Sequence, residues 1–136
     1  MHPLNAISGS ILDAAIRVHR SLGPGLLESV YEAVLAYELR ERGHHVQTQV
    51  PIPVVWNDVR LEAGFRADLI VDHLVIVEIK SVEALAPVHA KQVITYLRLA
   101  DKRLGLLINF NVDLLKDGVH RIVNNFDDAA HPSHTA

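Results

Sequence analysis

The stretch LVIVEIKSV, at residues 74–82, constrains the fold of this chain most strongly. Its first four residues are apolar on both faces of an extended chain, which is the pattern of a strand covered on both sides. Glu78 and Lys80 then interrupt the run. Because an unpaired buried charge is costly, these two side chains should be paired, solvated in a cleft or bound to a metal. The stretch predicts a central strand whose charged end emerges in a cleft.

Apolar residues at helical spacing predict the helices, and glycines predict where they stop. Gly23-Pro24 should end the first helix, and Gly43 should follow the second. The expected helices run over residues 7–22, 27–42 and 87–100. Pro87 suits the first turn of the last one.

Alternating or continuous apolar runs predict the strands. They should lie at 46–56, at 60–71 as one or two strands with a bend at Gly64, and at 74–82, 104–110 and 119–123. Pro51 and Pro53 cannot donate ladder hydrogen bonds, so the first strand should be an edge or bulged strand. Expected turns are Asn57-Asp58, Asp72-His73 and a hairpin-type turn at KDG, residues 116–118. The order ααβββαββ predicts an α+β domain whose first three strands form a meander.

Composition bounds the class of protein. With 136 residues and a hydrophobic fraction of 49%, the chain has the size and the apolar content of one domain. We assign residues 1–126 to that domain and expect 127–136 to be a flexible C-terminal tail. The lack of cysteine excludes disulfides and thiolate zinc sites. No secretory leader pattern and no run of membrane-spanning length is present, so we expect a cytoplasmic protein with no membrane partner.

Three charged residues on two strands suggest a catalytic site. Side chains alternate across a strand, so Glu78 and Lys80 point to one face. A hairpin with a turn at Asp72-His73 would bring Asp68 near residues 77–78. Two carboxylates with room for water suit a hard cation such as Mg²⁺, which can activate water for attack on a phosphate. The alternative is an ion pair on a solvated sheet face, but Asp68 and the apolar run before Glu78 favour a site.

Two pairs of helical residues add to this set. Gln92 and Tyr96 lie four apart on the last helix and share a face. Glu28 and Tyr31 lie three apart on the second helix. Each has an ordinary explanation when taken singly, as a solvated or half-buried side chain or a charge favourable to the helix dipole. Their value lies in the combination with the strand residues.

These motifs together resemble a known family. GLLESVY, at residues 25–31, matches the signature of the GxxExxY protein family. The segments GFRADLIV, VIVEIKSVEALAPVHAKQVITYL and GLLINFNVDLLKDGVHRIV are also similar to that family, so the resemblance runs from about residue 22 to 123. The family belongs to the PD-(D/E)xK nuclease-like superfamily. The resemblance implies a restriction-endonuclease-like core, in which helices flank a mixed central sheet.

The resemblance also implies a role for each residue of the acid–lysine set. Asp68 and Glu78 correspond to the two metal-binding acids, and the Ile79 carbonyl would be a further ligand. Lys80 corresponds to the catalytic lysine. Glu28 resembles a helical acid that joins the metal shell in several branches. The implied cofactor is Mg²⁺ or Mn²⁺.

The remaining implied roles concern the substrate and the support of the site. Gln92 and Tyr96 resemble the QxxxY motif of RecB-type nucleases, which helps to hold DNA or the site. Tyr31 belongs to the signature motif, and Arg66 is a candidate phosphate contact. The residue before Asp68 is Ala67, where the superfamily motif often has proline.

The net charge indicates how tightly nucleic acid would bind. A formal charge of −3 argues against a large nucleic-acid footprint. Setting aside Glu28, Asp68 and Glu78 leaves 13 of the 16 acids against 13 Lys+Arg, so the rest of the surface is neutral. Such a domain should bind nucleic acid weakly unless it forms a homodimer or has a partner.

The expected function is a metal-dependent phosphodiester hydrolase, a nuclease that acts on DNA in preference to RNA. One alternative is a catalytically silent module that keeps the nuclease-like fold and binds nucleic acid or protein. A weaker alternative is a self-assembling structural protein.

Overall fold

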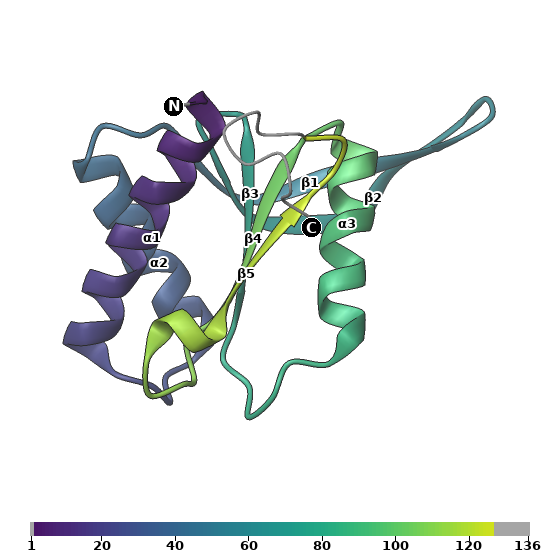
Figure 1. Cartoon of the computed structure of the whole chain (residues 1–136). Helices are drawn as coiled ribbons and strands as arrows, with labels where there is room; N and C mark the ends of the chain where they lie inside the picture. Colours follow the sequence, from purple (N-terminus) through teal and green to yellow (C-terminus); the bar gives the residue numbers. More distant parts are fainter. Residues whose placement is uncertain (1, 127–136) are drawn as a thin grey trace.

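The first two helices form one layer against the sheet (Figure 1). The computed structural model describes residues 2–126, in which α1 is Pro3–Leu22 and α2 is Glu28–Glu41. α1 begins four residues before the predicted start, because the His2 Nδ1 atom accepts the Leu4 N–H at 3.0 Å and so caps the helix. Its end at Leu22 is as predicted, since Gly23 has φ of 74°, which favours glycine.

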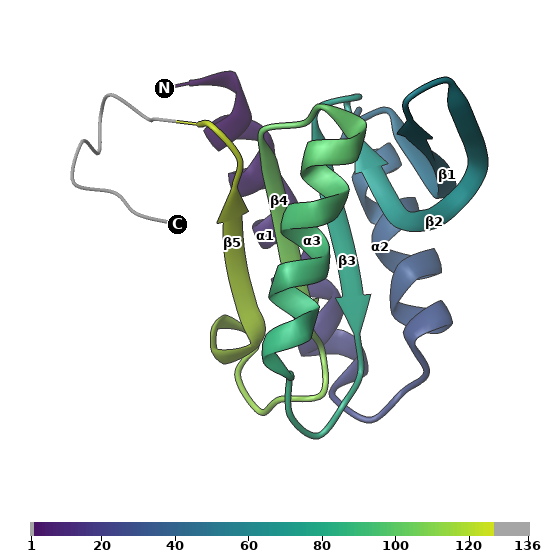
Figure 2. The same ribbon diagram turned by 90° about the vertical axis from the view of Figure 1, so that its right-hand side faces the viewer.

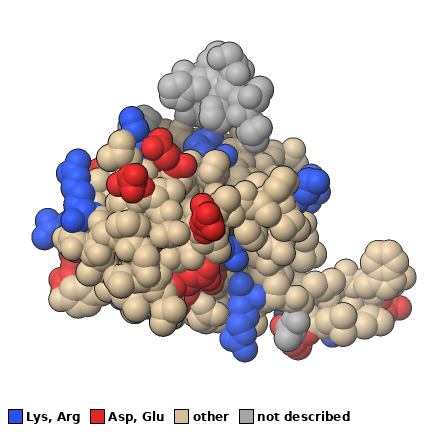
Figure 3. Space-filling model, turned by 90° about the horizontal axis from the view of Figure 1, so that it is seen from below, with Lys and Arg blue, Asp and Glu red and all other residues tan. Residues whose placement is uncertain are grey.

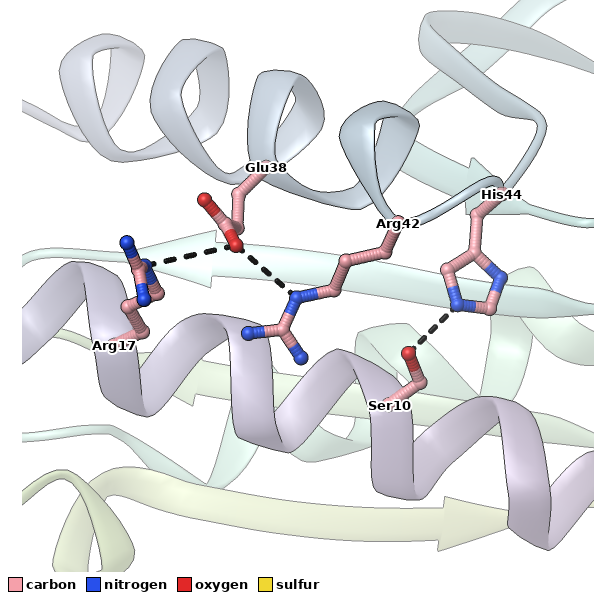
Figure 4. A network of polar contacts seen from close by, with 5 residues as sticks. All are labelled: Ser10, Arg17, Glu38, Arg42 and His44. Carbon is pink, nitrogen blue, oxygen red and sulfur yellow. Dashed lines mark hydrogen bonds and ion pairs between the residues drawn. The ribbon is translucent and has the colours of Figure 1, made fainter.

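A polar network outside the core ties α1 to α2 (Figure 4). The Glu38 carboxylate accepts a hydrogen bond from Arg42 Nε at 3.1 Å and lies 3.7 Å from Arg17 Nε. Ser10 Oγ and His44 Nε2 are 2.7 Å apart, which joins α1 to the segment that leads into the first strand. These contacts therefore join α1 to α2 and to the segment that precedes the first strand.

A five-stranded mixed sheet forms the central layer, with the order β1-β2-β3-β4-β5. β3 and β4 are parallel and the other neighbouring pairs are antiparallel. α3 connects β3 to β4 and covers the face opposite α1 and α2 (Figures 1 and 2). The order ααβββαββ and the edge position of β1 are confirmed. The bounds are β1 Val46–Trp56, β2 Val59–Val71, β3 Val75–Lys80, α3 Pro87–Ala100, β4 Leu104–Asn109 and β5 Val119–Val123.

Both faces of β3 are buried, as the apolar run predicts. Val75, Val77 and Ile79 belong to the core cluster beneath α1 and α2, whereas Ile76 belongs to the cluster beneath α3. By alternation, Glu78 lies on the same side of β3 as Ile76. β3 is the third of the five strands and therefore the central one. Its parallel pairing with β4 extends as far as Lys80.

Two sequence predictions about the strands need correction, whereas the irregularity expected at Gly64 is present. KDG forms part of a 3₁₀ helix, η1 (Leu115–Gly118), and not a hairpin-type turn. β2 is one continuous strand, and its ladder with β1 is irregular at Gly64: Ile52 pairs with Phe65 and Val54 with Leu61, so residues 62–64 of β2 lie opposite one residue of β1. β3 stops at Lys80, because Ser81 and the residue after it bond to other segments.

The predicted turn before β3 is present and fixes the register. Asp72 and His73 have φ of 53° and 60°, the two positive values that a type I′ hairpin turn requires. The resulting ladder pairs Leu69 with Val77. This register places Asp68 opposite Glu78, which confirms that Asp68 lies near residues 77–78.

Candidate active site

The site forms where β2 separates from β3. The ladder between them ends at Leu69 and Val77, so the next backbone N–H groups have no partner strand. The two carboxylates take their place: the Asp68 N–H donates to Glu78 Oε2 at 2.7 Å, and the Ile79 N–H donates to Asp68 Oδ2 at 2.8 Å. Each acid thus binds a backbone amide beside the other acid, and the pair is held at the end of the sheet.

Burial without a full counter-charge perturbs both acids. Burial, and then the charge of Asp68, raise the pKa of Glu78 to about 8, against a lowering effect of Lys80. Burial also raises the pKa of Asp68, although hydrogen bonds from Ile79 and Gln49 and the charge of Lys80 oppose the effect. Such a pair favours the approach of a cation, and strongly perturbed acids are typical of functional sites.

Lys80 and Tyr96 are the neighbours of this pair on the α3 side. The Lys80 ammonium lowers the pKa of both acids but forms no ion pair with either in the described part of the chain. Burial raises the Tyr96 pKa, and the charges of Glu78 and Asp68 raise it further. The Tyr96 ring stacks on Phe65 of β2, with 3.5 Å between centroids. Gln92, one turn earlier on α3, is exposed and lines a groove together with Tyr96.

α2 brings Glu28 to the other side of the site. Glu28 Oε2 accepts the Ser81 N–H at 3.1 Å, directly after β3. Its charge also raises the pKa of Asp68, so the two carboxylates lie close. Ser81 Oγ donates to the Leu26 carbonyl at 2.6 Å. The start of α2, the end of β3 and Asp68 therefore surround one space.

Tyr31 and Arg66 occupy different surroundings from the acids. Tyr31 is fully buried; its ring stacks on Phe110, and its hydroxyl donates to the Gly23 carbonyl at 2.5 Å and accepts the Leu26 N–H at 3.1 Å. This position supports the loop before Glu28. Arg66 is exposed on β2, and its Nη1 lies 3.5 Å from the Gln49 carbonyl.

Glu32 and Gln49 are site residues that sequence reasoning missed. Gln49 Nε2 donates to Glu32 Oε1 at 2.6 Å and to Asp68 Oδ1 at 3.2 Å, so it bridges α2 and β2. Burial raises the Glu32 pKa, and so does the charge of Asp68, against the Gln49 hydrogen bond. Gln49 has φ of 50°, an uncommon backbone state for a residue with a side chain, and such strain often occurs at functional sites.

Asn109 is a third missed residue, and it shapes the exit from β3. Its Oδ1 accepts the Val82 N–H at 3.1 Å and the Asn111 N–H at 3.2 Å, while its Nδ2 donates to the Val82 carbonyl at 2.9 Å. Asn109 is buried at the end of β4, directly beside Lys80 in the parallel ladder. It therefore fixes the segment that follows the lysine.

An open cavity of about 770 Å³ lies on the α2 side of Asp68, and Glu78 and Lys80 are not among its described lining residues. Its polar walls come from α2 and the sheet, and its lining includes Glu28, Glu32, Gln49, Asp68, Ser81 and Asn111. Figure 3 looks onto the end of the molecule where β3 ends. Acidic and basic side chains are interspersed among uncharged ones on the described residues of this face, which has no continuous basic patch.

The carboxylates fit a divalent cation of the Mg²⁺ type. Among residues 2–126, no group of three Asp, Glu or His side chains is arranged to hold an ion by itself. Mg²⁺ usually binds to only one or two carboxylates and keeps several waters or substrate oxygens. Asp68 and Glu78 could supply two such oxygen ligands, and burial is the main cause of the raised pKa of each.

A mixed sheet with helices on both faces, and with two acids and a lysine where two strands part, is consistent with a nuclease-like fold. The family model described as "PD-(D/E)XK nuclease superfamily" matches residues 5–122. The chain belongs to the PD-(D/E)XK nuclease superfamily. Searches of curated proteins and of solved structures gave no match. No helix in residues 2–126 has the length and apolar character to cross a membrane.

Proposed function

We propose that this protein is a nuclease that hydrolyses phosphodiester bonds with Mg²⁺ or Mn²⁺ bound at Asp68 and Glu78. The observation that supports the proposal most is the pair formed by the buried Glu78 and the half-buried Asp68, whose pKa values are raised and which has Lys80 beside it. The superfamily supplies the class of reaction. Residues 1–126 would act as one domain, since both core clusters share strands of one sheet.

Asp68, Glu78 and the Ile79 carbonyl would hold the metal, with Glu28 at the edge of its shell. The bound ion would supply an activated water and offset charge on the phosphate. Lys80 would orient or deprotonate the attacking water and stabilise the charge that develops on the phosphate. Because Glu78 holds a proton at neutral pH without metal, metal binding at this site would release a proton.

The substrate would lie across the open cavity, with DNA preferred to RNA. Arg66 would contact it, Gln92 and Tyr96 would support the site from α3, and Tyr31 would keep the loop before Glu28 in place. Since this face has no continuous basic patch among its described residues, binding should be weak and sensitive to salt.

A cleavage assay on single- and double-stranded DNA and RNA, with Mg²⁺, Mn²⁺ or EDTA, tests the proposal. The wild type should cut in metal and not in EDTA, whereas Asp68→Asn and Lys80→Met should lose at least about a hundredfold in rate. Asp13→Asn and Lys116→Met are matched controls on exposed positions away from the cavity and should keep full activity.

Cleavage that persists in Asp68→Asn would overturn the proposed site. Binding of nucleic acid without turnover in either metal would instead favour the catalytically silent module. Circular dichroism of each variant ensures that a loss of activity is not a loss of folding.

A further inference from the structure

The hairpin of β1 and β2 extends beyond the sheet as an arm, on the right in Figure 1. β2 pairs with β3 only over Leu69–Val71, whereas its pairing with β1 continues to Trp56 and Val59 at the tip. The arm is therefore a two-stranded ribbon without a third strand. Such ribbons are marginally stable alone, so exposed apolar residues on them need an explanation.

Most of the apolar residues of the arm lie on one of its two faces. The register pairs Val54 with Leu61 and Trp56 with Val59, and partners in a ladder share a face. Because residues two apart also share a face, these four side chains form a continuous surface, here called the apolar arm face. Trp56, Val59 and Leu61 are 73, 55 and 57% exposed.

The opposite face of the arm is different in character. Val55 pairs with Arg60, and Arg60 Nε forms an ion pair with Glu62 Oε1 at 2.6 Å. Between residues 54 and 62 the arm carries Asp58 and Glu62 against Arg60, a net charge of −1. The opposite face thus exposes one large apolar side chain, Val55, beside an ion pair, whereas the apolar arm face exposes three.

A groove of about 430 Å³ lies at the base of the arm, between the arm and α3. Its lining includes the apolar side chains of Val54, Phe65, Val88 and Leu99, and its one charged lining residue is Lys91. Val54 belongs both to the groove and to the apolar arm face, so the two surfaces are continuous. The groove could receive an apolar ribbon end that carries a net negative charge.

We propose that the apolar arm face and this groove form the interface of a homodimer in which two copies exchange arms. A twofold axis that sets the arms antiparallel would place each Trp56 tip at the base of the other arm, where the groove lies. Both contacts are then the same, and the assembly closes at two copies. The acidic tip would also meet Lys91 of the other copy's groove.

Burial of Trp56 would supply the largest single share of this contact. An aromatic side chain such as Trp56 buries roughly 150–250 Å², and a twofold axis makes the contact twice. Nucleic acid is a poorer occupant, because a ribbon with net negative charge repels phosphates. Pro51 and Pro53 also remove ladder donors from the open edge of β1, so strand addition there is disfavoured.

The chain offers a direct probe of this interface, because Trp56 is its only tryptophan. Sedimentation equilibrium should give twice the chain mass of 15.1 kDa. Trp56 fluorescence should shift to shorter wavelength as the concentration rises through the dissociation constant, since dimerisation removes the indole from water.

Val59→Lys and Val55→Lys make a matched pair, because these valines are 55 and 58% exposed but lie on opposite faces of the arm. Val59→Lys should weaken the dimer by at least about tenfold, and Leu99→Lys in the groove should do the same, whereas Val55→Lys should have little effect. Thermal melts check that all three variants fold.

The proposal would be overturned if the wild type stays monomeric at a concentration on the order of 100 µM, with unchanged Trp56 emission. Equal effects of the two valine variants, or a Trp56 emission shift that needs added DNA, would also overturn it. Nuclease activity is a separate measurement, so either proposal can fail without the other.

Discussion

Without metal, Glu78→Gln should be more stable than the wild type, and this difference should grow as the pH rises. Glutamine is neutral and keeps an oxygen that can accept the Asp68 N–H. The unfolded chain ionises Glu78 near pH 4.5, but the folded chain holds its proton to about pH 8. Between these values the folded state binds more protons than the unfolded state, so the free energy of unfolding falls as pH rises.

The size of the effect follows from the two pKa values. At about 1.4 kcal/mol per pH unit, the cost of the wild-type acid approaches about 3 kcal/mol at pH 7 and about 4 kcal/mol at pH 8, where the folded group is half ionised. These are upper values, because Asp68 shares the charge of the pair. Urea unfolding in EDTA at pH 5, 6, 7 and 8 measures the difference between wild type and Glu78→Gln.

That difference should be small at pH 5 and should grow by at least about 2 kcal/mol by pH 8. Histidines that titrate in the same range cancel, because both proteins contain them. Glu41→Gln, on the exposed end of α2, is the matched control and should parallel the wild type. Parallel curves for Glu78→Gln and the wild type would refute the assignment of a buried, proton-holding Glu78.

Three further predictions concern the support of the site and the packing of α3. Gln49→Ala and Gln49→Gly both remove the bridge between Glu32 and Asp68, so each should raise the Mg²⁺ concentration for half-maximal cleavage at least about threefold. The glycine variant should be about 1 kcal/mol more stable than the alanine variant, because glycine tolerates the positive φ at this position. An unchanged Mg²⁺ midpoint would remove Gln49 from the site. Tyr31→Phe keeps the stack on Phe110 but loses the hydroxyl bonds to the 23–26 loop, and should cost about 1–3 kcal/mol in urea unfolding. Gly105→Ala places a Cβ 2.8 Å from Val93 Cγ1 beneath α3 and should lower stability by about 1–3 kcal/mol in a thermal melt, whereas Gly9→Ala, with open space around it, should not.

The parts of the fold that depend on local pattern were predictable from the sequence. Helical spacing after Pro87 gave α3 its observed bounds, and the turn at Asp72 and His73 set the register that brings Asp68 to Glu78. The start of α1 was misplaced because its cap is the imidazole of His2, an unusual N-cap residue.

The parts of the site that depend on distant pairing were not predictable. Glu32 follows Glu28 by one helical turn and offered a weak signal, but nothing local marks Gln49, whose role depends on a positive φ and on the facing β2. Asn109 is found only through the parallel pairing of β4 with β3. The catalytic and metal-binding roles of Asp68, Glu78 and Lys80 stay predictions that the geometry supports.

Asp68 and Glu78 should hold one metal ion together, and a crystal structure of the full chain soaked in Mn²⁺, with anomalous data, tests this. One anomalous peak should lie within about 2.0–2.4 Å of an oxygen from each carboxylate, with the Ile79 carbonyl beside it. Well-separated carboxylates without a shared peak, or Mn²⁺ bound only elsewhere, would contradict it.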